Sequence, residues 1–246
     1  MNNIILLVFE GERTERLIWT SLHRFHLNDA KSPIVYGIYG GEIYSLFHKM
    51  EADSDLDLFS LIKEDFRNVG LLDGILKDQV SEIYLFFDYD GHAPAATDEK
   101  LLRMLTFFNE ETENGKLYLS YPMVESLRHL HPDVPFDSLS VECKLKIGYK
   151  GMVVKESLAA YHDVTVYTDA QWAHVLLEHC KKLNSLMLGQ FSFPTEYFDQ
   201  SSVFKQQLDK FIVPDSKVSV LSAFPIFLLD YYGCAAFDGR LAAVQV

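Results

Sequence analysis

Two runs of consecutive apolar residues in this chain each end abruptly in a carboxylate. Residues 4–9 (IILLVF) are followed by Glu10, and residues 83–87 (IYLFF) are followed by Asp88 and, two positions on, by Asp90. Apolar runs of this length without alternation are typical of strands that are buried on both faces, as in a parallel sheet. Because ligands of such sheets bind at the carboxyl ends of the strands, these three carboxylates are candidate functional residues.

Segments with helical periodicity alternate with these strands. After Glu10, apolar positions at helical spacing predict a helix that contains Leu17, Ile18, Ser21, Leu22 and Phe25. We expect further helices over residues 42–50, 56–66 and 97–113, further strands over residues 33–38 and 116–121, and a helix that begins at Pro122. This alternation predicts an α/β fold, in which a mostly parallel sheet is flanked by helices.

The second half of the chain is expected to be mainly helical. Thr168 and Gln171 have the spacing of a capping box, which predicts a helix that ends at Gly189. Another helix is expected to begin at Ser201 or Ser202 and to end at Pro214, and the apolar residues 218–237 predict a buried helix. We therefore expect two regions: residues 1–130 with the sheet, and residues 131–246 as a mainly helical region that packs directly on it.

The composition fits a globular protein with a sizeable core. The chain has 246 residues, and 48% of them are hydrophobic. No stretch reaches the roughly 18 to 20 apolar residues that span a bilayer, and residues 4–9 are too few for a signal peptide. We expect a cytoplasmic protein that does not enter a membrane. Cys143, Cys180 and Cys234 are far apart and have no paired His or Cys neighbours, so neither a disulfide framework nor a zinc site is predicted.

The net charge of −13 argues at first against nucleic acid as a partner. Residues 143–155 are the exception, because they contain four lysines and no acidic residue. Lys144, Lys146 and Lys150 in this segment could follow a phosphate backbone while Tyr149 stacks on a base. The alternative is that these lysines form a solvated face with no ligand.

The spacing of Asp88 and Asp90 suggests a metal. In an extended strand both side chains would point to the same side, about 7 Å apart at the backbone. Two anions this close are costly without a cation between them, and Mg²⁺ binds one or two carboxylates while it keeps positions for water and phosphate. The alternative is that both residues merely begin a loop after a buried strand.

A family resemblance rests on two motifs. Glu10-Gly11 followed by Thr14-Glu15, and then Asp88-Tyr89-Asp90 about seventy residues later, resemble the Toprim domain. This domain is shared by topoisomerases, bacterial primases, small ribonucleases and the overcoming-lysogenization-defect (OLD) nucleases. The resemblance covers about residues 1–130. It implies a nuclease that hydrolyses DNA or RNA with Mg²⁺ or Mn²⁺, with Glu10 as general base or metal ligand and both aspartates as metal ligands.

Accessory residues follow from the same resemblance. Glu125 resembles an acidic residue of nuclease branches that bind a second metal; the alternative is a first-turn residue that pairs with Arg128. His92, where the family has a small residue, would contact a phosphate or leaving group, or cap the loop. Glu15 lies in the first turn of the predicted helix, where the helix dipole favours an anion.

Other functions and partners stay open. A haloacid-dehalogenase-like phosphohydrolase also has its nucleophile in D-x-D after a buried strand, but it has Thr or Val at the position of His92 and makes no use of Glu10. A third possibility is a non-catalytic regulatory subunit with a Toprim fold. OLD nucleases are joined to an ABC-type ATPase, and this sequence lacks G-x-x-x-x-G-K-[ST]. The resemblance therefore implies a separate ATPase partner, a possible homodimer and a role in anti-phage defence.

Overall fold

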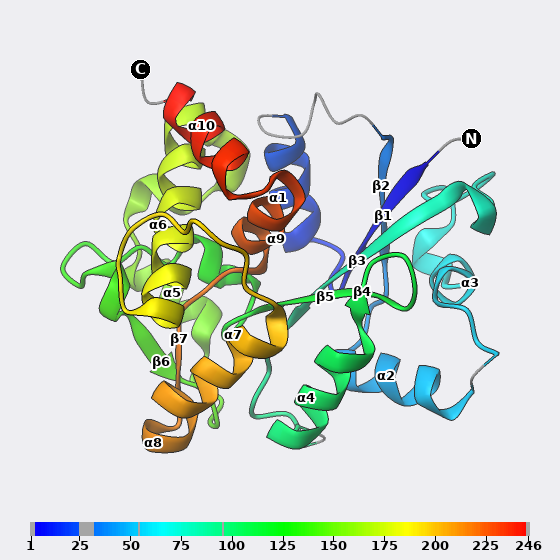
Figure 1. Cartoon of the computed structure of the whole chain (residues 1–246), viewed down its shortest axis with the longest axis horizontal. Helices are drawn as coiled ribbons and strands as arrows, with labels where there is room; N and C mark the ends of the chain where they lie inside the picture. The colour runs from blue at the N-terminus through cyan, green and yellow to red at the C-terminus, as the bar shows by residue number, and fades with distance from the viewer. Residues whose placement is uncertain (1–2, 25–31, 54, 95, 245–246) are drawn as a thin grey trace.

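A five-stranded sheet of order β2-β1-β3-β5-β4 forms the centre of the computed structural model, which describes residues 3–24, 32–53, 55–94 and 96–244 (Figure 1). Its strands are β1 (Ile4–Phe9), β2 (Ile34–Ile38), β3 (Val80–Asp88), β4 (Asn109–Glu110) and β5 (Gly115–Ser120). The pairs β1–β2, β1–β3 and β3–β5 are parallel, and only β4 is antiparallel to its neighbour. The predicted α/β fold with a mostly parallel sheet is confirmed.

Four helices in the first half follow the predicted order. They are α1 (Thr14–Leu22), α2 (Ile43–Ala52), α3 (Leu58–Lys63) and α4 (Asp98–Phe107). Ile18 and Leu22 of α1 are buried as expected, while Phe25 lies outside the described residues. The predicted helix over 97–113 is too long, because residues 109–114 are all polar and offer no apolar face; there the chain turns back through β4 and pairs with β5.

Pro122 does not begin an α-helix. A short 3₁₀ helix, Val124–Arg128, follows it instead. In the second half, α6 (Asp169–Leu188) has the predicted capping box between Thr168 and Gln171 and ends at Gly189, whose φ of 74° is left-handed. The capping prediction for this helix is confirmed.

Two other predictions in the second half need correction. Asp199, not Ser201 or Ser202, caps α7 (Gln200–Gln207), since its carboxylate accepts the amide of Ser202 at 2.9 Å. Pro214 lies in the short helix α8 (Val213–Asp215), which continues directly from α7 through a π-helical turn, Leu208–Ile212, so the helical segment ends at Asp215, one residue beyond the predicted end.

The predicted helix over 218–237 is instead a strand and two helices. Strand β7 (Lys217–Ser219) pairs with β6 (Ser140–Glu142), and the chain continues as α9 (Ala223–Tyr232) and α10 (Cys234–Val244). Of the α-helices in the described part of the second half, α5 (Tyr149–Glu156) precedes α6. Apolarity alone did not distinguish a short buried strand from a helix in this segment.

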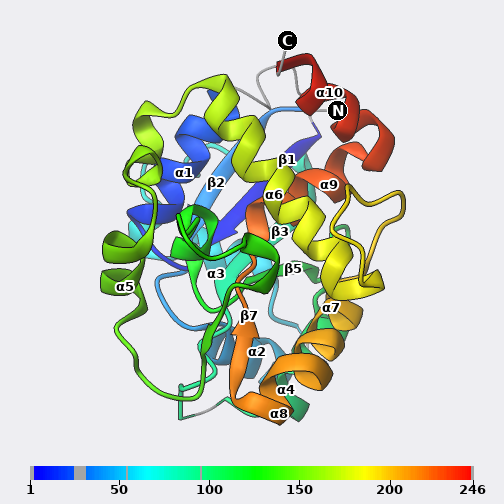
Figure 2. The same cartoon turned by 90° about the vertical axis from the view of Figure 1, so that its left-hand side faces the viewer.

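Helix α9 joins the two halves of the chain. The ring of Phe224 stacks on Phe86 of β3 with a centroid distance of 4.8 Å, and Phe227 packs edge-on against Tyr84 at 5.0 Å. Figure 2 looks onto this side of the molecule, where α6 lies over α9 and α9 lies over the sheet. Through α9 the C-terminal region packs directly on the sheet. Among the described residues no helix is long and apolar enough to cross a bilayer, and all three cysteines are free.

Candidate active site

The carboxyl ends of β1 and β3 lie side by side and bring Glu10 to Asp88. The two strands are in register with Phe9 opposite Phe86, so the chain leaves both strands at the same edge of the sheet. The amide of Asp88 donates a hydrogen bond of 2.9 Å to Oε2 of Glu10, and the amide of Glu10 donates to the carbonyl of Phe86 at 3.2 Å. The sequence placed these two residues at one edge, and the structure joins them.

Asp88 is the buried centre of the site. It is 9% exposed, and its Oδ1 accepts the amide of Val124 at 2.8 Å. This bond fixes the 3₁₀ helix 124–128 against the end of β3 and so positions Glu125. No side-chain pattern in the sequence reveals a backbone amide as a partner, and sequence reasoning did not find Val124.

Asp90 does not continue the strand. Strand β3 ends at Asp88, Tyr89 is 2% exposed, and Asp90 has a left-handed φ of 42°, which Asp tolerates better than most residues. Gly91 is needed here because a Cβ would lie 2.4 Å from the ring of Tyr89. The expectation that strand alternation places both aspartates is therefore wrong, since a turn around the buried tyrosine positions Asp90.

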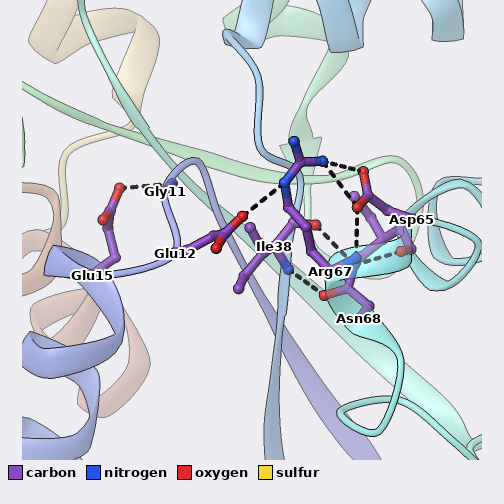
Figure 3. Close-up of polar contacts among 8 residues, drawn as sticks. Gly11, Glu12, Glu15, Ile38, Asp65, Arg67 and Asn68 are labelled. Carbon is purple, nitrogen blue, oxygen red and sulfur yellow. Dashed lines mark hydrogen bonds and ion pairs between the residues drawn. The ribbon is translucent and has the colours of Figure 1, made fainter.

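Glu15 and Glu125 are the other buried carboxylates of the site, at 7% and 2% exposed. Oε1 of Glu15 accepts the amide of Gly11 at 2.9 Å, and a Cβ on Gly11 would lie 2.9 Å from Oε2 of Glu15 (Figure 3). Oε1 of Glu125 lies 3.4 Å from Nζ of Lys150, and its Oε2 is buried without a hydrogen-bond partner. We define the carboxylate cluster as Glu10, Glu15, Asp88, Asp90 and Glu125.

Glu12 stands apart from the carboxylate cluster. Figure 3 shows it on the other side of the loop from Glu15, bonded to the guanidinium of Arg67, which also binds Asp65. Arg67 Nε lies 2.9 Å from the Glu12 carboxylate. The charge of Glu12 is therefore compensated outside the site.

Electrostatics within the carboxylate cluster favour protons or a cation. Burial, with the nearby charges of Asp90 and Glu15, raises the pKa of Glu10 to about 8, although the amide of Asp88 acts in the opposite direction. Burial and the charge of Glu10 hold the pKa of Asp88 well above its usual range. Burial likewise raises the pKa of Asp90 and of Glu15. Several anions in so little water are stable only when their charge is compensated.

The donor set of the carboxylate cluster fits a hard divalent cation. Carboxylate oxygens are the ligands of Mg²⁺ and Mn²⁺, and Oε2 of Glu125 is a buried acceptor without a partner. As the described side chains stand, no three His, Cys, Asp or Glu groups converge on a single point that would hold a metal. Glu10 and Asp88 are instead occupied by the amides of Asp88 and Val124.

Two of the three candidate lysines in the segment 143–155 have acidic partners in the structure. Nζ of Lys144 lies 3.1 Å from the carboxylate of Asp98 and 3.3 Å from the hydroxyl of Tyr89. Lys150 pairs with Glu125, and Lys146 is exposed. From the sequence, Lys144 and Lys150 were expected to be free for a nucleic acid, but in the structure both contact acidic residues.

Tyr149 does not offer its ring to a base. It is 4% exposed, its hydroxyl lies 2.9 Å from Nδ1 of His129, and the two rings meet edge-on. The prediction that Tyr149 stacks on a base is therefore wrong, because the first turn of α5 faces inward at this residue.

A pocket of about 400 Å³ opens beside Asp90. Its lining includes His92, Met123, Lys146 and Lys150. His92 is exposed at this pocket, and its charge opposes the rise in the pKa of Asp90. The loop itself is closed by the amide of Ala93, which donates to the carbonyl of Asp90 at 2.8 Å.

Arg128 is not the partner of Glu125. Its Nη1 donates a hydrogen bond to the carbonyl of His162, while Lys150 forms the ion pair with the carboxylate of Glu125. Glu125 does lie in the first turn of the 3₁₀ helix Val124–Arg128, but the predicted pairing with Arg128 is wrong. Arg128 instead lines a second pocket together with Arg13, a residue that sequence reasoning did not consider.

Comparisons of this chain with models of protein families, with curated proteins and with solved structures found no match. The two motifs and their position at the ends of β1 and β3 are thus the basis for any functional assignment.

Proposed function

We propose that this protein is a metal-dependent nuclease that hydrolyses phosphodiesters of DNA or RNA, with a Toprim-type active site. The observation that carries the proposal is the bond between Glu10 and the amide of Asp88, at the shared edge of two parallel strands. It gathers the residues of both motifs into one buried group of carboxylates. A phosphodiester binds to such a group only through a cation, which supports Mg²⁺ or Mn²⁺ as the cofactor.

The residues suit separate tasks. When bound, the divalent ion would stabilise charge on the phosphate oxygens, with Asp88, Asp90 and Glu125 as its protein ligands. Oε2 of Glu10 holds the amide of Asp88, which leaves Oε1 for a proton. Because this oxygen lies beside the proposed metal ligands, Glu10 is our candidate general base for an attacking water.

The test is cleavage of plasmid DNA and of a long RNA with Mg²⁺ or Mn²⁺, by the wild type and by Glu10→Gln and Asp88→Asn. Both substitutions keep an acceptor for the amide that each carboxylate now binds, so the fold is expected to persist. We expect each to reduce cleavage at least 100-fold. Cleavage by Glu10→Gln at the wild-type rate would refute the proposal. Hydrolysis of a small phosphomonoester without any nuclease activity, independent of Glu10, would instead identify the phosphohydrolase alternative.

We also propose that an ATPase partner controls the activity, in anti-phage defence. The support is the lack of a nucleotide-binding P-loop in this chain together with the resemblance to OLD nucleases. Co-expression with the neighbouring genes and affinity purification test it. Recovery of a fully active chain without any partner would contradict this part of the proposal.

A further inference from the structure

A second pocket of about 340 Å³ adjoins the carboxylate cluster on the side of α1. We name it the arginine pocket, after Arg13 and Arg128 in its lining. Thr14, Lys150 and Glu125 also line it, so it shares Glu125 with the carboxylate cluster and Lys150 with the pocket beside Asp90. A molecule in this pocket would lie directly next to one bound at the carboxylates.

Neither arginine has a carboxylate partner at ion-pair distance among the residues that the structure describes. Arg13 is exposed, whereas Nε of Arg128 is buried without a hydrogen-bond partner. Within the described residues, Arg128 donates one hydrogen bond, from Nη1 to a neutral acceptor, the carbonyl of His162. The chain has 35 acidic and 22 basic residues, and these two arginines are nevertheless without an acidic partner at ion-pair distance.

The acidic residues of the arginine pocket leave this excess of positive charge in place. Glu125 is paired with Lys150, and Asp163 caps a short 3₁₀ helix through the amide of Thr165 at 2.9 Å. Hydrogen bonds from the hydroxyl and the amide of Thr165 lower the pKa of Asp163, and the charge of Arg128 acts in the same direction without an ion pair between them. Glu125 and Asp163 are thus both occupied, and the two guanidinium groups are left for a ligand.

The start of α1 adds to the attraction for an anion. Arg13 is the N-cap residue of this nine-residue helix, and its own side chain makes no capping hydrogen bond. The amino end of a helix carries partial positive charge and favours phosphate groups. Guanidinium groups bind phosphate through paired hydrogen bonds, which makes arginine the suited residue for this ligand.

We propose that the arginine pocket binds a phosphate group of the nucleic acid, next to the phosphodiester at the carboxylate cluster. The identity of the ligand as nucleic acid rests on the proposed function. The phosphate could come from the chain backbone or from a 5′ end, and the pocket's chemistry is the same for both. Arg13 and Arg128 are its ligands, and neither takes part in bond cleavage.

The experiment measures binding without cleavage. Fluorescent single-stranded oligonucleotides of about 12 nucleotides are titrated with the full chain in chelator, over a series of salt concentrations. We expect Arg13→Ala to weaken binding about tenfold and to reduce the log–log salt slope by about 0.7. Arg16→Ala is the matched control, because Arg16 is exposed one turn further along α1 and does not line the pocket.

A second variant distinguishes weaker binding from loss of the fold. Arg128→Lys keeps the charge but loses the paired guanidinium donors, and it should weaken binding while the thermal melting temperature stays close to that of the wild type. Unchanged affinity and salt slope in both Arg13→Ala and Arg128→Lys would overturn the proposal.

The substrate arms distinguish the two sources of phosphate. If a 5′ end is bound, the effect of Arg13→Ala should disappear with a 5′-hydroxyl oligonucleotide and with a closed circle. If the backbone is bound, Arg13→Ala should weaken binding of all three substrates, the 5′-phosphorylated oligonucleotide, the 5′-hydroxyl oligonucleotide and the closed circle. Because no metal is present, arginine-dependent binding by a chain that never cleaves nucleic acid would refute the proposed function alone. If the wild type cleaves nucleic acid but Arg13→Ala and Arg128→Lys bind it as tightly as the wild type, the proposal for the arginine pocket alone would be refuted.

Discussion

The amide of Asp88 donates a hydrogen bond of 2.9 Å to Oε2 of Glu10, across the boundary between β3 and β1. This bond places the carboxylate of Glu10 against the backbone of Asp88, in a part of the molecule where water has little access. The two acidic side chains are thereby held close although their charges repel. A proton on Glu10 or a bound cation relieves this repulsion.

The first prediction concerns that cation. Mg²⁺ or Mn²⁺ should raise the melting temperature of the wild type, because an ion that binds only the folded state adds about 2.7 kcal/mol at one hundred times its Kd. Asp88→Asn should lose most of this shift, because it removes a central negative charge from the site. The fold should persist, because the asparagine keeps an acceptor for the amide of Val124. Thermal melts with and without Mg²⁺ measure it.

Glu12→Gln is the control for the cation experiment, since Glu12 is bound to Arg67 outside the carboxylate cluster. Its melting temperature should respond to Mg²⁺ as that of the wild type does. An equal response in Asp88→Asn would show that the ion binds elsewhere on this acidic chain.

The second prediction is a pH dependence of the metal-free protein. The pKa of Glu10 is raised from 4.5 to about 8, so the folded state holds a proton that the unfolded state releases between these values. The contribution is complete below pH 4.5 and is lost as the pH rises towards 8, by at most about 1.4 kcal/mol per pH unit. Urea unfolding in chelator between pH 5 and pH 8.5 measures it.

In Glu10→Gln this loss should be absent, because the amide does not titrate. Its free energy of unfolding should therefore fall less than that of the wild type over the same range. Parallel curves for the two proteins would mean that Glu10 is ionised in the folded state.

The sequence was informative where the signal is local. The apolar runs that form β1 and β3 are continuous, so their ends, and with them Glu10 and Asp88, could be located without the fold. The left-handed turn at Asp90 depends on the burial of Tyr89 under residues from other segments, such as Tyr121 and Phe204. No local pattern contains that information.

Partners that lie far apart in the sequence were the main source of error. Lys144 meets Asp98, 46 positions away, and Lys150 meets Glu125. The segment resembles a free basic patch in the sequence, but in the folded chain these two of its four lysines have acidic partners. Tyr149 was misjudged for a similar reason, because its partner His129 belongs to another element.

The third prediction tests the ion pair between Lys150 and Glu125. Glu125 is 2% exposed, and Lys150 supplies the only ion pair it makes within the described part of the chain. Lys150→Met should therefore lower the free energy of unfolding of the metal-free protein by about 1–3 kcal/mol, because a buried carboxylate loses its partner. Lys155→Met, an exposed position on the same helix, should have little effect.

The double variant Lys150→Met/Glu125→Gln makes the third prediction specific. It removes the unpaired charge, so it should be more stable than Lys150→Met alone, with a coupling energy within about 0.5–3 kcal/mol. Strictly additive effects of the two substitutions would show that the pair does not stabilise the fold.

The fourth prediction is acid sensitivity caused by His179 in α6. This side chain is fully buried, and burial lowers its pKa to about 3. Its Nδ1 accepts the amide of Ser222 at 3.1 Å, and its Nε2 donates to the carbonyl of Leu127 at 3.1 Å. Both ring nitrogens are thus used by the neutral form, and a proton on Nδ1 would face the donor of Ser222.

The sign for His179 is opposite to that for Glu10. The unfolded chain binds a proton below pH 6.5 and the folded chain does not, so stability from His179 is present above pH 6.5 and is lost as the pH falls towards 3. His179→Gln stays neutral throughout; it should be less stable than the wild type at pH 7, and this difference should shrink as the pH falls to 4. His174→Gln, an exposed position on the same helix, should follow the wild-type curve. Chemical unfolding at half-unit pH steps measures the free energy of unfolding of the wild type, His179→Gln and His174→Gln. A constant difference between His179→Gln and the wild type would show that His179 accepts a proton in the folded state as readily as in the unfolded one.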